Sequence, residues 1–125
     1  MRKDMLYQMV FDYLEPQLPE RWDEVVFYAE YSDVSYIIEF YVKEGKTFTK
    51  CFDIPHTSMK ELLSTFAEID KLLSTERKNT SKKNLWTTMT MVVTNKGKVK
   101  VDYEYDDLTE NAFAHKKKWR SKYLA

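Results

Sequence analysis

The sequence predicts an α+β domain with a single antiparallel sheet of about five strands, in the order α-β-β-β-α-β-β-α. Short runs rich in Val, Ile, Phe and Tyr follow one another and are joined by tight turns, which favours antiparallel neighbours. Segments with apolar residues at helical spacing lie outside these runs, so we expect helices packed on a face of the sheet. At 125 residues the chain is long enough for one domain, residues 1–125, and short for two.

The first half of the chain predicts one helix and three strands. Residues 3–15 place apolar side chains on one helical stripe, and Pro16 ends this helix. Turn residues at Ser32-Asp33 and Glu44-Gly45-Lys46 separate three runs of strand-forming residues. The expected strands are residues 25–31, 35–42 and 47–52.

The second half predicts a long helix, a hairpin and a last helix. Ser58 and Glu61 match a capping box before the clearest apolar stripe of the chain. That stripe consists of Met59, Leu62, Leu63, Phe66, Ile69 and Leu73. Basic residues dominate residues 76–84, which we expect to form an exposed loop. The remaining expected elements are strands at 86–93 and 99–105, joined by a turn at Asn95-Lys96-Gly97-Lys98, and a helix from a cap at Thr109 to Tyr123.

The charges of the chain balance overall but not along its length. Hydrophobic residues make up 43% and aromatic residues 15%, which is enough apolar surface for a folded core. Twenty basic and twenty acidic residues give a net charge of zero, although residues 1–45 are acidic and residues 46–125 are basic. Because proteins that bind nucleic acid or anionic membranes usually carry a basic excess, we expect neither partner.

No arrangement in the sequence is typical of an enzyme. Cys51 is the single cysteine, which rules out an intramolecular disulfide, and we expect it to be a small buried side chain. His56 and His115 are expected at the surface or as capping groups. Gly45 and Gly97 both serve turns, so neither builds a phosphate-binding loop. We therefore expect no catalytic activity and no cofactor.

The segment from Asn95 to Leu108 is the most informative for function. Strand alternation places a charged set on one face and an apolar set on the other. The charged set is Lys98, Lys100, Asp102 and Glu104, and the apolar set is Val99, Val101, Tyr103 and Tyr105. The acidic run continues through Asp106 and Asp107, so one strand offers both charge and anchoring surface to a protein partner. The predicted partner-binding residues are Asp102, Glu104, Asp106, Asp107, Tyr103 and Tyr105.

Two other uses of these charged groups are disfavoured. The carboxylates from Asp102 to Glu110 suit calcium or magnesium, but they lack the glycine of an EF-hand loop and alternation separates them, so we expect no metal site. The basic and aromatic cluster at residues 116–120 suits nucleic acid, but cations are also favoured near a helix C-terminus. We expect this cluster to be an ordinary exposed helix face.

Four segments carry a resemblance to a known family. They are LPERWDEVVFYAEY (18–31), FDIP (52–55), WTTMTMVVTNKGKVKVDYEYDDL (86–108) and KWRSKYL (118–124). Taken together and in this order, they resemble the YezG-like immunity proteins, the bacterial antitoxins that neutralise LXG-type toxins exported by the type VII secretion system. The chain departs from the pattern in the His-Lys-Lys-Lys run before Trp119 and in the basic segment 76–84, and both departures bear on the choice of partner.

The resemblance implies a non-enzymatic cytoplasmic protein that holds the C-terminal toxic domain of an LXG-type protein, commonly a nuclease, inactive until export. A nuclease offers a cationic surface to phosphates, which carboxylates on a rigid strand complement. On this hypothesis the acidic residues speed the encounter, and Tyr103 or Tyr105 supplies a buried anchor. The alternative is a secretion chaperone or adaptor, for which the same order of elements is suitable. The oligomeric state, including a homodimer, is left open.

The N-terminal residues indicate where the protein acts. They form a charged amphipathic segment without the apolar stretch of a signal peptide, and no run of the sequence is long and apolar enough for a membrane span. We expect a soluble cytoplasmic protein without a membrane partner.

Overall fold

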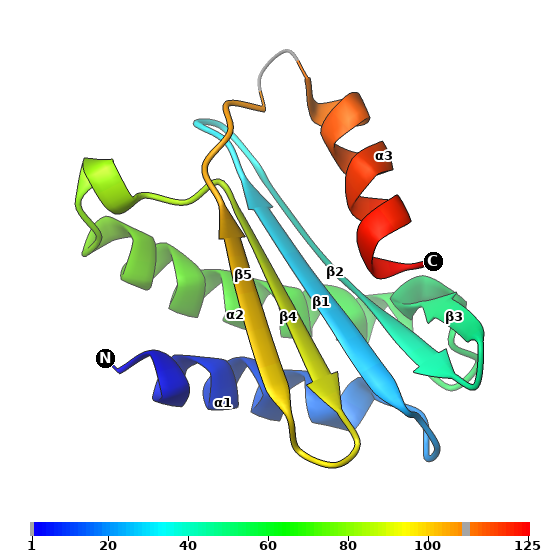
Figure 1. Ribbon diagram of the computed structural model, residues 1–125. Helices are drawn as coiled ribbons and strands as arrows, with labels where there is room; N and C mark the ends of the chain where they lie inside the picture. Colours follow the sequence, from blue (N-terminus) through cyan, green and yellow to red (C-terminus); the bar gives the residue numbers. More distant parts are fainter. Residues whose placement is uncertain (1, 109–110) are drawn as a thin grey trace.

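A computed structural model describes residues 2–108 and 111–125. The helices are α1 (Lys3–Leu14), α2 (Met59–Lys78) and α3 (Ala112–Tyr123). The strands are β1 (Glu24–Tyr31), β2 (Tyr36–Glu44), β3 (Thr47–Lys50), β4 (Thr88–Thr94) and β5 (Val99–Glu104). All five form one antiparallel sheet in the order β3-β2-β1-β4-β5 (Figure 1). The predicted fold class and the predicted order of elements are confirmed.

β1 is the central strand, and it pairs with β2 on one side and β4 on the other. The β2–β3 and β4–β5 hairpins each turn through a glycine in the left-handed region, Gly45 at φ +63° and Gly97 at φ +86°, where other residues are strained. Asp23 supports the first turn, since its carboxylate accepts a hydrogen bond of 2.6 Å from the Gly45 amide. The short β3 and the longer β5 are left as the two edges of the sheet.

Two helices cover one face of the sheet. α1 and α2 lie side by side across it, with α2 carrying the chain from the β3 edge to β4 (Figure 1). Ser58 caps α2 as predicted, because its hydroxyl oxygen accepts a hydrogen bond of 3.1 Å from the Glu61 amide. The helix residues buried in this core are Leu6, Val10, Leu14, Leu62, Phe66, Ile69 and Leu73. Met59 and Leu63, predicted to share the buried stripe, are instead exposed near the start of α2.

The third helix lies on the opposite face, so the prediction that the helices pack on one face is wrong for α3. Trp119 of α3 is 2% exposed and packs with Val26, Tyr28 and Tyr41 of the sheet in a second, smaller core. The central strand β1 carries apolar side chains on both faces, so the face opposite α1 and α2 must also be buried, and α3 buries it. The domain therefore has three layers, with the sheet in the middle (Figure 1).

Several predicted boundaries shift. α2 continues to Lys78, so the loop expected at residues 76–84 begins later and contains a short 3-10 turn at Lys82–Asn84. Arg77 explains the extension, because its guanidinium donates to the Trp86 carbonyl and lies 4.8 Å from the Tyr31 ring. β3 ends at Lys50 and Cys51 begins another 3-10 turn, although Cys51 is buried as predicted. The proposed cap at Thr109 lies outside the described residues.

Within residues 2–108 and 111–125, no helix combines the length and the apolar character that crossing a membrane requires.

Candidate functional site

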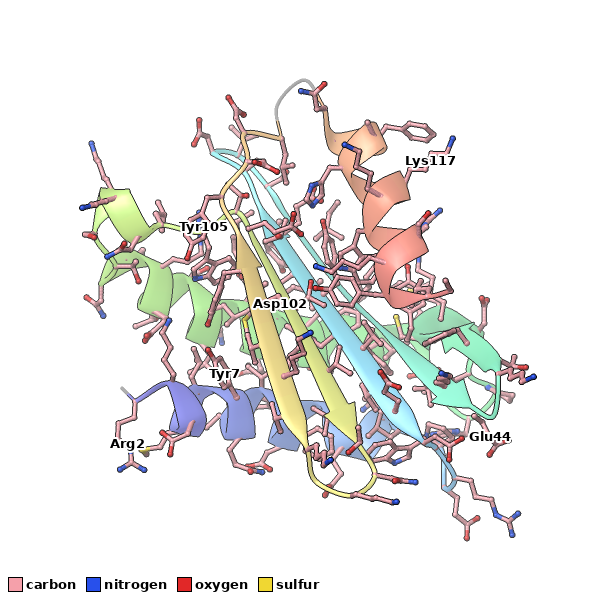
Figure 2. All side chains as sticks on the ribbon, in the orientation of Figure 1. Arg2, Tyr7, Glu44, Asp102, Tyr105 and Lys117 are labelled. Carbon is pink, nitrogen blue, oxygen red and sulfur yellow. The ribbon has the colours of Figure 1, made fainter. Side chains whose placement is uncertain are left out.

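Alternate side chains of β5 lie on opposite faces of the sheet, as predicted. Asp102 lies on the face that carries α3, where its carboxylate accepts a hydrogen bond of 2.6 Å from the Tyr123 hydroxyl (Figure 2). Burial and this hydrogen bond raise the pKa of Tyr123, which keeps the hydroxyl protonated as a donor. Asp102 thus helps to hold α3 on the sheet.

Tyr103 lies on the other face and packs into the core beneath α1. Its hydroxyl is 2.9 Å from the Tyr7 hydroxyl, and its ring centroid is 5.5 Å from that of Trp86. Burial, followed by the contact with Tyr7, raises the pKa of Tyr103. The six predicted partner-binding residues are therefore divided between two faces and do not form one surface.

The acidic residues gather where β5 ends. Glu104 is the last residue of the strand, and Asp106 and Asp107 follow it with exposed side chains. Together with residues of α3 they line a groove of about 710 Å³. On its helix side the groove is lined by His115, Lys118, Trp119, Lys122 and Tyr123. The groove therefore brings three of the predicted acidic residues, Glu104, Asp106 and Asp107, close to α3.

A second, smaller pocket continues this region towards the turn between β1 and β2. Tyr105, which is 58% exposed, lines it with Asp33, Arg77 and Asp107, and its volume is about 300 Å³. Asp33 was not predicted from the sequence, because the sheet topology alone brings the β1–β2 turn beside the segment after β5. We call Asp33, Asp106 and Asp107, all exposed, the acidic rim.

Two apolar side chains are strongly exposed on elements that flank the acidic rim. Val34, next to Asp33 in the β1–β2 turn, is 94% exposed, and Phe113 in the first turn of α3 is 86% exposed. Neither was predicted, although both leave a signal in the sequence. Val34 is an apolar residue inside a polar turn, and Phe113 lies off the stripe that carries Trp119. Exposed apolar groups beside charge are common at protein-binding surfaces.

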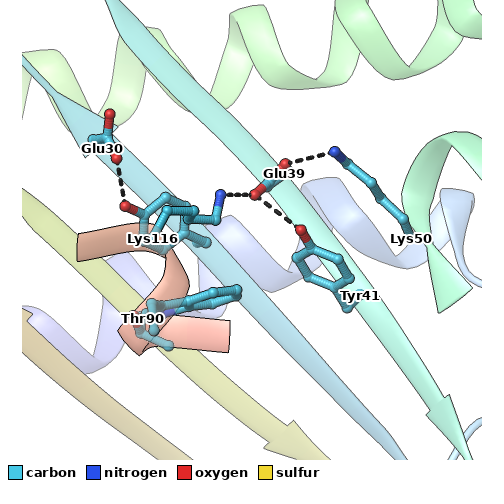
Figure 3. Close-up of polar contacts among 8 residues, drawn as sticks. Glu30, Glu39, Tyr41, Lys50, Thr90 and Lys116 are labelled. Carbon is cyan, nitrogen blue, oxygen red and sulfur yellow. Dashed lines mark hydrogen bonds and ion pairs between the residues drawn. The ribbon is translucent and has the colours of Figure 1, made fainter. Parts of the chain in front are cut away.

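A buried ion-pair network fixes α3 to the sheet (Figure 3). The Glu39 carboxylate of β2 is buried and accepts hydrogen bonds from the Lys116 ammonium and from the Tyr41 hydroxyl, the latter at 3.1 Å. Lys50 approaches the same carboxylate at 3.2 Å. Burial alone would raise the pKa of Glu39, but Lys116, aided by Lys50, outweighs it and lowers the pKa.

The same packing corrects the prediction for the basic cluster at residues 116–120. The Lys116 ammonium lies 4.2 Å from the Tyr28 ring centroid, and the Trp119 indole donates a hydrogen bond of 2.9 Å to the Thr90 hydroxyl. Both residues face the sheet because they lie on the side of α3 that covers β1 and β2. Trp119 is consequently inaccessible for stacking on a nucleic-acid base.

The two histidines differ in environment. His56 is exposed, as predicted. His115 is not a surface group, because its side chain is only 9% exposed and points towards Glu104. The spacing of four residues between His115 and Trp119 places both on the buried side of α3. This correction bears on the groove described above, since His115 lines it.

The thiol of Cys51 offers no nucleophile. The side chain is fully buried, and burial raises the pKa of the thiol, which disfavours the reactive thiolate. The accessible side chains of the region are acidic, basic and apolar, a mixture that suits recognition of another protein.

Comparison with known proteins gives consistent matches. The model of the family "Immunity protein YezG-like" matches residues 4–125. Immunity protein YezG of Bacillus subtilis (strain 168) is 31% identical over 111 residues, covering 82% of this chain and 73% of that protein. Immunity protein YezG of Bacillus spizizenii is 29% identical over 110 residues, covering 82% of this chain and 68% of that protein.

Proposed function

The chain belongs to the YezG-like immunity protein family, and on that premise we propose that its partner is the C-terminal toxic domain of an LXG-type protein exported by type VII secretion. The role as an immunity protein follows from the family match, which extends over residues 4–125. In this proposal the protein acts in the cytoplasm of the producing cell, where it binds the toxic domain and holds it inactive without catalysing a reaction.

The acidic rim is the surface we assign to the partner. Asp33, Asp106 and Asp107 are exposed, Tyr105 lines a pocket with Asp33 and Asp107, and Val34 is next to Asp33. Charged side chains around apolar ones match the usual composition of a protein interface. Of the residues predicted from the sequence, Tyr105, Asp106 and Asp107 are exposed, whereas Asp102 and Tyr103 are half-buried.

The sign of the rim supports a cationic partner. A nuclease domain binds phosphates through Lys and Arg, so an inhibitor that covers this surface gains from carboxylates. Opposite charges across an interface mainly accelerate association, and this effect weakens as salt rises. We therefore propose that the toxic domain is a nuclease and that the acidic rim is placed over its phosphate-binding surface.

The experiment is a charge reversal of the rim with a matched control. The test variant is Asp106→Lys combined with Asp107→Lys, and the control is Glu20→Lys combined with Glu44→Lys, two exposed residues that line a pocket near the other end of the sheet. Association with the purified toxic domain is measured by surface plasmon resonance at low and high salt. We expect the test variant to associate at least about tenfold more slowly at low salt and the control to retain wild-type kinetics.

Two outcomes count against parts of the proposal. Unchanged affinity of the test variant at low salt removes the rim from the interface. Failure of the wild-type protein to protect cells that express the toxic domain contradicts the assigned partner. A secretion chaperone, the alternative class, would raise the yield or export of the toxin without suppressing its activity, so the protection assay separates the two functions.

A further inference from the structure

One cluster in the groove between β5 and α3 has the composition of a metal site. Glu104, Asp106 and His115 each offer one ligand atom, and these atoms all lie within 4.8 Å of one another. We infer that the three side chains bind a divalent transition-metal ion, with Zn²⁺ as the ion of choice. This inference does not rest on the proposed function, because it concerns the isolated chain.

His115 gives the independent reason to assign a ligand here. Its Nε2 atom is buried and has no hydrogen-bond partner within the described part of the chain. Glu104 Oε1 is the facing acceptor, but at 3.9 Å it is too distant for a hydrogen bond. A buried nitrogen without a partner is costly, and a metal ion placed between the imidazole and the carboxylate removes that cost.

The acidic members of the cluster are available for coordination. Among residues 2–108 and 111–125, no Lys or Arg forms an ion pair with Glu104 or Asp106. Bonds of about 2 Å to a shared Zn²⁺ bring ligand atoms to roughly 3.3 Å from one another, so the site must contract on binding. The exposed Asp106 side chain follows the end of β5 and can rotate to make this change.

The chemistry of the three ligand atoms indicates which class of metal ion they would bind. One imidazole nitrogen and two carboxylate oxygens are ligands that Zn²⁺ accepts, whereas Ca²⁺ and Mg²⁺ prefer oxygen alone. Three protein ligands leave a fourth position, and the groove of about 710 Å³ has room for a water molecule there. A bound ion would join the end of β5 to α3 and would stabilise the folded state in proportion to its binding.

The test is a titration of the full chain, freed of metal by a chelator and dialysis. Binding of Zn²⁺ is measured by calorimetry, and Co²⁺ is added as a second probe because its visible absorption reports four-coordinate geometry. The variants are His115→Ala and Glu104→Gln, with His56→Ala as the matched control for the other histidine. Circular dichroism verifies that each variant is folded before titration.

We expect one Zn²⁺ per chain, a thermal midpoint that rises with Zn²⁺, and binding weakened at least about tenfold in His115→Ala and Glu104→Gln but unchanged in His56→Ala. If His115→Ala does not fold, Glu104→Gln decides the result, since it keeps the size of the side chain. Absence of saturable binding in the wild-type protein, or equal binding in wild type and Glu104→Gln, overturns the inference. Neither result depends on whether a toxic domain binds the acidic rim.

Discussion

Lys116 of α3 donates a hydrogen bond to the buried carboxylate of Glu39 at the centre of β2, and so joins the C-terminal helix to the sheet (Figure 3). Among the described residues of α3 only Trp119 is buried, and Tyr123 packs half-buried against the same small core. The groove, which β5 and α3 line together, therefore keeps its shape only while α3 remains attached.

Replacing Lys116 by Met tests this attachment. The variant leaves the Glu39 carboxylate buried with Lys50 as its remaining cation, so we expect the free energy of unfolding to fall by about 2 kcal/mol. Lys117→Met is the matched control, because the Lys117 side chain is exposed one position further along the same helix (Figure 2). Urea denaturation followed by circular dichroism measures both. Equal free energies of unfolding for Lys116→Met and Lys117→Met would contradict a structural role of the Lys116–Glu39 ion pair.

Because the Glu39 carboxylate is buried and paired, we expect the folded protein to lose stability in acid. The pKa of Glu39 is lowered from its ordinary value of 4.5, with burial opposing and Lys116 favouring the shift. A lowered pKa in the folded state stabilises the protein above the unfolded pKa, and this stabilisation is lost as the pH falls through the folded value. Thermal unfolding between about pH 7 and pH 3 should therefore show a steeper loss for the wild type than for Glu39→Gln. Parallel profiles would show that other carboxylates account for the acid sensitivity.

Replacing either of two aromatic residues of α3 should change the free energy of unfolding by very different amounts. Trp119→Ala removes a buried indole that packs 4.6 Å from the Tyr28 ring and donates to Thr90, so we expect a loss of about 3 kcal/mol or more. Phe113→Ala removes a ring that is 86% exposed on the same helix and should change stability by less than about 0.5 kcal/mol. Thermal and urea unfolding compare the two. A large loss in Phe113→Ala would mean that this ring is packed in solution.

The elements of the fold were predictable because each has a local signal. The runs of strand-forming residues around Tyr28 and Val42, the glycine turns, and the cap at Ser58 all depend on residues within a few positions of one another. The boundary at Lys78 was missed because Arg77 gains its stabilising partner from Trp86, which lies beyond the loop. Propensity and periodicity contain no information on such a contact.

The face covered by α3 was not predictable in the same way. Its apolar stripe is thin, and three consecutive lysines do not reveal which one is directed to the sheet. One signal was present, since Glu39 interrupts an apolar strand run and a carboxylate there needs either solvent or a cation. The identity of that cation depends on tertiary packing, and so does the approach of Asp33 to Asp107.

Tyr103 and Tyr105 were both predicted as anchors, but they lie in different environments. Replacing each of them should therefore affect the partner complex differently. Tyr105 is exposed beside the acidic rim, so Tyr105→Ala should weaken binding of the toxic domain at least about tenfold while leaving the free energy of unfolding within about 0.5 kcal/mol. Tyr103→Phe removes the hydroxyl that contacts Tyr7 and should cost about 1 kcal/mol of stability without changing affinity. Calorimetric titration with the toxic domain and urea unfolding measure both quantities for each variant. The reverse pattern, with affinity lost in Tyr103→Phe and kept in Tyr105→Ala, would place the interface on the α1 side of β5 and away from the acidic rim.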